Sequence, residues 1–155
     1  MKVLSLMLFT GIILSGCSGA RPSRTGPLDG RLPPCPASPN CVSSQSTDQD
    51  HAIEPLRFSG TAAEAMADLH AVLALLKRTK IVTESGGYLH AECTSLLLRF
   101  VDDLEFLIDT REQVIHVRSA SRLGYSDLGV NRKRVETIRM IWERLHQEQN
   151  HKHPR

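Results

Sequence analysis

The spacing of apolar residues predicts two amphipathic helices. In the first, apolar residues recur at intervals of three and four, as on one face of an α-helix: Ala62, Met66, Leu69, Leu73 and Leu76. Thr61 and Glu64 have the spacing of a capping box at its start. Basic residues suit the negative C-terminal end of a helix, and three follow the stripe: Lys77, Arg78 and Lys80. A second apolar stripe predicts a final helix: Val135, Ile138, Ile141, Trp142 and Leu145.

Outside the first helix, several stretches between residues 53 and 121 alternate apolar and polar residues, which is typical of β-strands. Pro55 indicates that the first strand, within 53–58, lies at a sheet edge, because proline cannot donate a ladder hydrogen bond. Further strands are expected at 80–85, 88–100, 104–109 and 114–121. Turns are expected at Gly86-Gly87, at Asp102-Asp103 and at 110–113. The sequence therefore predicts an α+β two-layer sandwich, an antiparallel sheet covered by two helices, in the order β-α-β-β-β-β-α.

The N-terminus has the layout of a secretory signal peptide. Met1-Lys2 gives a basic start, residues 3–14 are uncharged and mostly apolar, and Ser15-Gly16 precede Cys17. This order resembles the lipobox of bacterial lipoproteins, in which the cysteine is acylated. A plain cleaved signal peptide followed by an ordinary cysteine is the alternative. The apolar run of about twelve residues is too short for a membrane-spanning helix, which needs roughly 20.

Five segments are expected along the chain. They are a lipoprotein signal peptide at 1–16, lipidated Cys17 with a flexible linker over 17–34, a cysteine-bracketed loop at 35–50, a folded domain at 51–149 and a disordered tail at 150–155. The linker expectation rests on four prolines, three glycines and no aromatic residue between positions 18 and 34.

Cys35 and Cys41 bracket a loop that contains two prolines. In an oxidising envelope compartment a disulfide between them is the simplest interpretation. Free thiols and a metal site are the alternatives, although no further ligands follow at the spacing of a zinc finger. Cys93 shares the alternation of Leu89 and Ala91, so we expect a buried, inert thiol.

The net charge gives no reason to expect a nucleic-acid partner. The chain has 19 Lys and Arg and 17 Asp and Glu, and removal of residues 1–16 would leave 18 against 17. Nucleic-acid-binding domains usually show a strong basic excess.

The densest polar stretch runs from Arg118 to Glu136, between the last strand and the last helix. This stretch, the Cys-Pro-Ala-Ser-Pro-Asn-Cys-Val-Ser-Ser loop and residues 99–106 resemble motifs of the DUF 1499 family, a domain of unknown function. The resemblance covers the chain from about Cys35 to Leu145. It implies no established activity.

Within that stretch, the sequence favours Asn131 as the N-cap of the last helix, with Arg132, Lys133 and Arg134 in its first turn. That is the unfavourable end for cations. Internal carboxylates could compensate, and the candidates are Asp102, Asp103, Glu105 and Asp109. An external anion could also compensate, since helix amides and arginines form natural anion sites.

Both interpretations stay open, and the candidate ligand-binding residues are Arg118, Ser119, Ser121, Arg122, Ser126, Asp127, Asn131, Arg132 and Arg134. We expect the four arginines of this set to share a concave surface with Asp102 and Asp127.

A catalytic alternative uses the Ser, His, Asp and Arg residues around 116–127. His116, Asp127 and nearby serines supply the parts of a nucleophile, base and orienter. The glycines that flank Ser126 do not have the spacing of a nucleophile elbow. We assign no catalytic residue, no metal and no cofactor, and interpret the C-terminal histidines as part of an unpacked end of the chain.

The function expected from these patterns is a lipid-anchored binding or interaction module of the bacterial envelope, with an envelope hydrolase as the alternative. The expected partners are the membrane, through the lipid on Cys17, and an anionic small molecule, a lipid headgroup or an envelope protein. Ser18, rather than Asp, follows the cysteine. By resemblance to Gram-negative lipoproteins, this favours the periplasmic face of the outer membrane, if the source has one.

Overall fold

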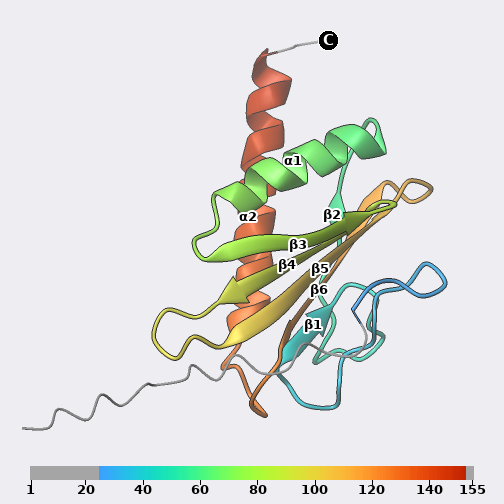
Figure 1. Ribbon diagram of the computed structural model, residues 1–155. Helices are drawn as coiled ribbons and strands as arrows, with labels where there is room; N and C mark the ends of the chain where they lie inside the picture. Colours follow the sequence, from blue (N-terminus) through green and yellow to red (C-terminus); the bar gives the residue numbers. More distant parts are fainter. Residues whose placement is uncertain (1–24, 153–155) are drawn as a thin grey trace, which may run out of the picture.

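Six strands form one antiparallel sheet in the computed structural model, which describes residues 25–152 (Figure 1). The strands are β1 (Cys41–Ser43), β2 (Leu56–Arg57), β3 (Thr79–Ser85), β4 (Tyr88–Thr94), β5 (Val101–Asp109) and β6 (Val114–Ser121). The helices are α1 (Ala62–Ala74) and α2 (Val130–Lys152). The strand order is β1-β6-β5-β4-β3, and β2 also pairs with β6. From β2 onward the elements follow the predicted order, so the α+β class is confirmed.

β1 is an additional strand within the stretch that we expected to be a loop. Its three residues pair with the end of β6, with Cys41 opposite Ala120 and Ser43 opposite Arg118. β2 is shorter than the predicted strand and pairs only with Ile115 and Val114 of β6. Pro55 directly precedes it, in keeping with its place at an edge.

The main hydrophobic core lies between one face of the sheet and both helices. Alternate residues of β5 and β6 point into it, among them Leu104, Phe106, Ile115 and Val117. α1 contributes Leu69, Val72 and Leu73, and α2 contributes Val135, Ile138 and Trp142. The capping box of Thr61 and Glu64 is confirmed at the start of α1. Ala65 and Val72, which lie outside the predicted stripe, are buried, whereas Met66 only packs at its edge.

The other face of the sheet is covered in part by residues that we expected to belong to the linker. Leu32 is buried against Tyr88 and Leu107, and the Gly26 amide donates to Glu105. Residues 25–34 therefore lie on the sheet and do not form the flexible linker that was expected of them. Cys17 and the signal peptide lie outside the described residues.

The predicted ends of the first helix and of the strand 88–100 are wrong, because the apolar and basic residues beyond each true end continue the local pattern. α1 ends at Ala74, so Lys77 and Arg78 occupy the following turn and Lys80 lies in β3. β4 ends at Thr94, and residues 95–100 form the loop to β5. The Asp102-Asp103 pair is therefore no turn but the start of β5. Both carboxylates are buried and paired with arginines, which removes the usual reason for such a pair to sit in a turn.

The cysteines follow the sequence expectations. Cys35 and Cys41 form a disulfide, and Cys93 is a free, buried thiol. α2 continues to Lys152, within the segment expected to form the tail. Within residues 25–152, no helix combines the length and the apolar character needed to cross a membrane.

Candidate functional site

Asn131 is the centre of the polar cluster on the helix side of the sheet. It is fully buried, and its side-chain oxygen accepts a 2.6 Å hydrogen bond from the Ser119 hydroxyl. Its amide nitrogen donates to the Asn40 carbonyl, to Ser121 and to Asp127 at 3.0, 2.9 and 2.8 Å. The cluster thus joins the loop before β1, the end of β6 and the start of α2.

Asn131 is not the N-cap, because α2 begins at Val130 and Asn131 already lies in its first turn; the side chain that caps the helix amides comes from Asp127. The Asp127 carboxylate accepts the backbone amides of Gly129 at 3.0 Å and Asn131 at 2.7 Å. A carboxylate at this position satisfies free amides and opposes the positive end of the helix dipole.

Arg134 completes the helix-side cluster. Its guanidinium donates to Ser119, to the Asn131 side chain and to the Asp102 carboxylate. Its side chain is 16% exposed. Arg134 is the fifth residue of α2, and its charge is compensated by an internal carboxylate, one of the two possibilities left open by the sequence.

A second ionic cluster lies on the opposite face of the sheet. Arg122 donates through two nitrogens to Asp103, at 2.9 and 2.6 Å, and also to Glu92 at 2.7 Å. His90 lies 2.8 Å from the same aspartate. Burial alone would raise the pKa of Asp103, but the hydrogen bonds from Arg122 and His90 outweigh it and lower the pKa to about 2.

Glu105 lies two positions after Asp103 on the same face of β5, is fully buried and has three donors. Arg118 donates at 2.7 Å, the Tyr88 hydroxyl at 2.8 Å and the Gly26 amide at 2.9 Å. Burial and the charge of Glu105 raise the pKa of Tyr88, which keeps the hydroxyl a donor. Arg118 Nε is buried and has no hydrogen-bond partner among the described residues.

The expectation that four arginines share one concave surface is therefore wrong. Arg118 and Arg122 do lie on the same face, as the alternation of β6 predicted, but α2 packs against the other face. Arg134 lies on that helix side, and Arg132 instead donates to the carbonyls of Ala52 and Asp50, each at 2.8 Å. Among residues 25–152, loss of Arg132 would therefore leave no carboxylate without its partner.

The hydrolase alternative has no assembled centre among the described residues. The Ser126 hydroxyl accepts the Leu128 amide at 3.3 Å, with no histidine bonded to it. His116 lies at the far end of β6 and contacts the Ser44 hydroxyl at 3.3 Å. Of the C-terminal histidines, His146 lies on α2 and contacts Asp68 of α1.

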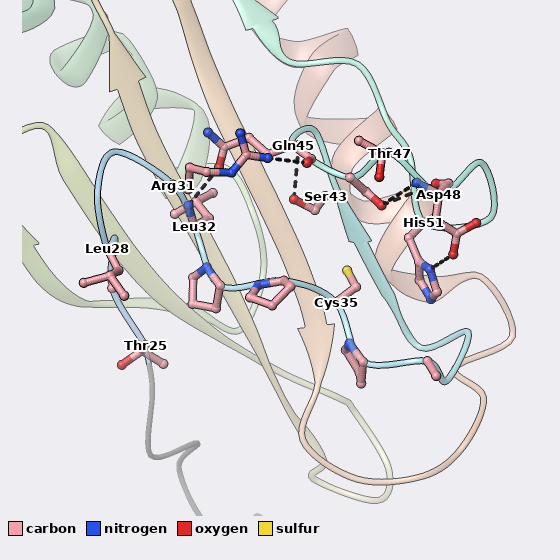
Figure 2. A pocket seen from close by; sticks show the side chains of 16 residues that line it. Thr25, Leu28, Arg31, Leu32, Cys35, Ser43, Gln45, Thr47, Asp48 and His51 are labelled. Carbon is pink, nitrogen blue, oxygen red and sulfur yellow. Dashed lines mark hydrogen bonds and ion pairs between the residues drawn. The ribbon is translucent and has the colours of Figure 1, made fainter.

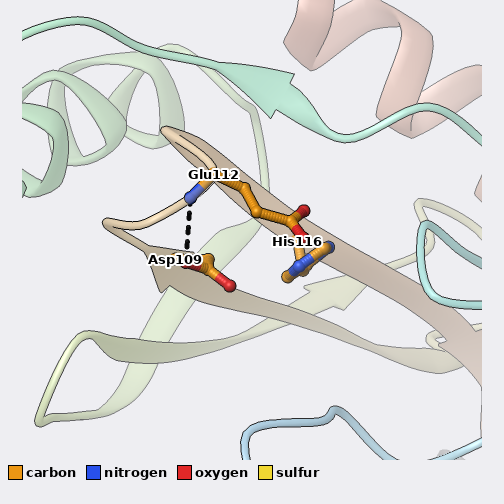
Figure 3. Close-up of side chains that lie close together, drawn as sticks. All are labelled: Asp109, Glu112 and His116. Carbon is orange, nitrogen blue, oxygen red and sulfur yellow. Dashed lines mark hydrogen bonds between the residues drawn. The ribbon is translucent and has the colours of Figure 1, made fainter.

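Asp109, Glu112 and His116 lie together at the turn between β5 and β6, with one donor atom of each within 4.8 Å of the others (Figure 3). Burial lowers the pKa of His116, which favours the neutral imidazole. The Asp109 carboxylate already accepts the amides of Arg111 and Glu112. Exposed acidic turns of this kind are common without an ion, so we assign no metal here.

A pocket of about 1020 Å³ lies between the segment 25–37 and the loop 43–51 (Figure 2). Leucine and proline side chains form much of its wall: Leu28, Leu32, Pro33, Pro34 and Pro36. Gln45 holds the two sides together, because its side chain accepts the Leu32 amide and its carbonyl accepts Arg31, each at 2.8 Å.

His51 and Ser43 are buried polar residues of this pocket. One ring nitrogen of His51 lies 2.6 Å from Asp48 and the other 3.1 Å from the Ser38 carbonyl. The Ser38 carbonyl and the Asp48 carboxylate raise the pKa of His51. The pocket therefore combines apolar walls with the exposed cation of Arg31, while His51 is paired with Asp48, which also lines the pocket.

Sequence reasoning missed this pocket and the Tyr88, His90 and Glu92 row. Part of the pocket lining comes from residues 25–34, whose prolines and glycines had predicted a linker. The polar row of β4 could have been predicted from the sequence. His90 and Glu92 alternate with apolar neighbours, and they pair with Glu105 and Asp103 of β5.

Comparison with curated proteins finds no match to this chain. A family model described as "Protein of unknown function (DUF1499)" matches residues 31–141, which include both ionic clusters and most of the pocket lining. The three sequence stretches that resemble this family all lie within that range. The chain therefore belongs to the DUF1499 family of proteins of unknown function.

Proposed function

We propose that this chain is a lipid-anchored protein of the bacterial envelope whose folded domain binds an amphipathic ligand with an anionic group. The anchor rests on the signal-like start and on Cys17. If the source is Gram-negative, Ser18 favours the periplasmic face of the outer membrane. The membrane is then the first partner, and a lipid headgroup, an anionic small molecule or an envelope protein is the second.

The observation that carries the binding role is the pocket beside residues 25–37. Its volume suits a small molecule or part of a lipid. The proline and leucine walls suit an apolar portion, and the exposed Arg31 suits an anion, whereas His51 is already paired with Asp48. The described lining begins at Thr25, eight positions after Cys17, so a ligand in the pocket would be bound close to the membrane surface.

The junction residues around Asn131 do not form the ligand site in this proposal. Asn131 is bonded to Ser119 and Asp127, and Arg134 and Arg122 are each paired with an aspartate. A hydrolase centred on residues 116–127 has no comparable support, since Ser126 and His116 contact other groups.

The test is native mass spectrometry of the full chain extracted from its own membranes. A co-purifying small amphiphile is expected in addition to the covalent lipid. Ala37→Trp should displace it, because Ala37 lines the pocket. Ala74→Trp, at the exposed end of α1, is the matched control and should retain it. A wild-type chain without any bound molecule, or equal occupancy in the two variants, would contradict the proposal.

A further inference from the structure

One end of the molecule gathers three neighbouring connections. They are the α1–β3 turn (residues 75–78), the β4–β5 loop (95–100) and the β6–α2 loop (122–129), at lower left in Figure 1. Backbone hydrogen bonds join them through the strand ends, from Thr94 to the Arg78 carbonyl at 3.0 Å and from Arg122 to the Val101 carbonyl at 3.3 Å. We call these residues, together with Val130, the loop end.

The loop end concentrates exposed apolar side chains. Of the eleven large hydrophobic residues that are exposed among the described residues, nine belong to it. Leu97 is 86% exposed, Leu128 94% and Tyr125 76%. Monomeric soluble proteins rarely gather so many exposed apolar groups, and such a patch marks an interaction surface.

The backbone of these loops is held by their own polar groups. The Ser95 hydroxyl accepts the Phe100 amide at 2.8 Å, and the Ser95 amide donates to the Phe100 carbonyl at 2.8 Å. Ser126 and Asp127 accept amides in the other loop. The polar atoms thus fix the loop shape, and the leucines stay at the surface.

The charge at the loop end is positive. Lys77, Arg78 and Arg99 are exposed there. The one acidic residue of the three connections is Asp127, whose carboxylate accepts the helix amides. Apolar side chains flanked by cations fit an anionic lipid surface, where the leucines enter the acyl boundary and each cation near the headgroups contributes about 1 kcal/mol.

We infer that the loop end docks onto an anionic lipid surface, the same membrane that carries the anchor. This inference takes only the lipid anchor on Cys17 from the proposed function. Gly26 is bonded to Glu105, four residues along β5 from Val101, or about 13 Å from the loop end. The nine residues from Cys17 to Gly26 span at most about 30 Å. The tether is therefore long enough for Cys17 and the loop end to reach one bilayer.

The first test places a tryptophan at the loop end of the full chain. Leu97→Trp is reconstituted in vesicles of phosphatidylcholine and phosphatidylglycerol that carry brominated acyl chains. Bromine quenching of the new tryptophan is expected if Leu97 enters the bilayer. Trp142, the native tryptophan, is 3% exposed in the core and provides a constant background.

Met140→Trp is the matched control. Met140 is exposed on α2, ten residues or about 15 Å beyond the start of the helix, so it should remain unquenched. Thermal melts followed by circular dichroism establish that both variants fold. Equal quenching of the two variants in chains that float with the vesicles would overturn docking while leaving the tether intact.

The second test removes one charge. Arg99→Gln, introduced beside Leu97→Trp, should lower the ratio of docked to undocked domain about fivefold on anionic vesicles, which corresponds to about 1 kcal/mol for one cation. It should have little effect on pure phosphatidylcholine. Arg111→Gln changes an exposed arginine at the opposite end of the sheet and should leave the ratio unchanged.

Two further outcomes separate the proposals. If Cys17 carries no lipid but added vesicles still quench Leu97→Trp, the lipid anchor is contradicted and the docking surface is supported. If Leu97→Trp escapes quenching and cysteines placed at Ser95 cross-link two copies of the chain, the loop end is a self-association surface and lipid docking is overturned.

Discussion

At the scale of single residues, the buried charges on the face away from the helices hold the strand ends together. Arg122 and Asp103 are 5% and 1% exposed, and their pairing is bidentate. Removing one partner of such a pair leaves a buried charge without compensation, which typically costs about 3–5 kcal/mol. This pair is therefore a sensitive point of the fold, although the pair as a whole need not stabilise it.

We expect Arg122→Leu to lower the free energy of unfolding by about 3–5 kcal/mol, because Asp103 would keep only His90 as a partner. Urea unfolding followed by circular dichroism measures the change. Arg111→Leu in the exposed β5–β6 turn is the control and should change stability by no more than about 0.5 kcal/mol. Similar values for the two variants would show that the ion pair contributes nothing specific.

Asp103 also gives the protein a defined acid response. Its pKa of about 2 in the folded state lies below the value of about 3.9 expected in the unfolded chain. Its contribution to stability is therefore fully present above about pH 4 and is lost as the pH falls toward about 2. We expect Asp103→Asn to flatten the fall in urea midpoint across this window. An unchanged slope would mean that other carboxylates carry the acid response.

At the scale of elements, the disulfide fixes the segment that leads into β1. Cys41 pairs with Ala120 at the end of β6, and the loop from Cys35 forms part of the pocket wall. Closing so short a loop removes about 2 kcal/mol of unfolded-state entropy on the chain-entropy model.

Replacing both Cys35 and Cys41 by serine should lower the free energy of unfolding by about 2 kcal/mol, as measured by urea unfolding under oxidising conditions. Non-reducing peptide mapping of the native chain should recover these two cysteines joined. Cys93 should react with iodoacetamide only after unfolding, since it is buried and burial raises the pKa of its thiol. Rapid alkylation of Cys93 in the folded chain would contradict its place in the core.

The elements that sequence predicted well are those with a strong local period. The capping box of Thr61 and Glu64, the inward row of β5 and the stripe of α2 follow directly from residue spacing. The Asp102-Asp103 pair was misread because two adjacent aspartates in isolation favour a turn. Their partners, Arg134 and Arg122, are 32 and 19 positions away, and no local pattern reveals them.

The candidate site could be predicted only in part, for the same reason. Which residues are polar was visible, but which face of the sheet each side chain meets depends on where α2 packs. Residues 25–34 were misjudged because their composition suits a linker, whereas Leu32 finds apolar partners in Tyr88 and Leu107 on the far face.

At the scale of the whole molecule, the pocket and the loop end would act together at a membrane. Gly26, which lines the pocket, is bonded to Glu105 of β5, and the loop end lies about 13 Å along the same strand. A domain docked through its leucines and arginines would therefore hold the pocket close to the headgroups rather than at the full length of the tether. Both contacts would then orient the domain on one bilayer.

Cys17→Ser separates the covalent anchor from this docking. We expect the substitution to abolish palmitate labelling and to leave the precursor unprocessed, with Cys93→Ser as the control that labels normally.

Several acyl chains hold a protein firmly, so wild type should leave the membrane only with detergent. Attachment through exposed cations is screened by salt. In a soluble chain that begins at Ser18, concentrated salt should therefore release whatever binding the loop end provides. Palmitate incorporation into the Cys17→Ser chain would refute the lipid anchor, and salt-resistant binding of the shortened chain would mean that the leucines alone hold it.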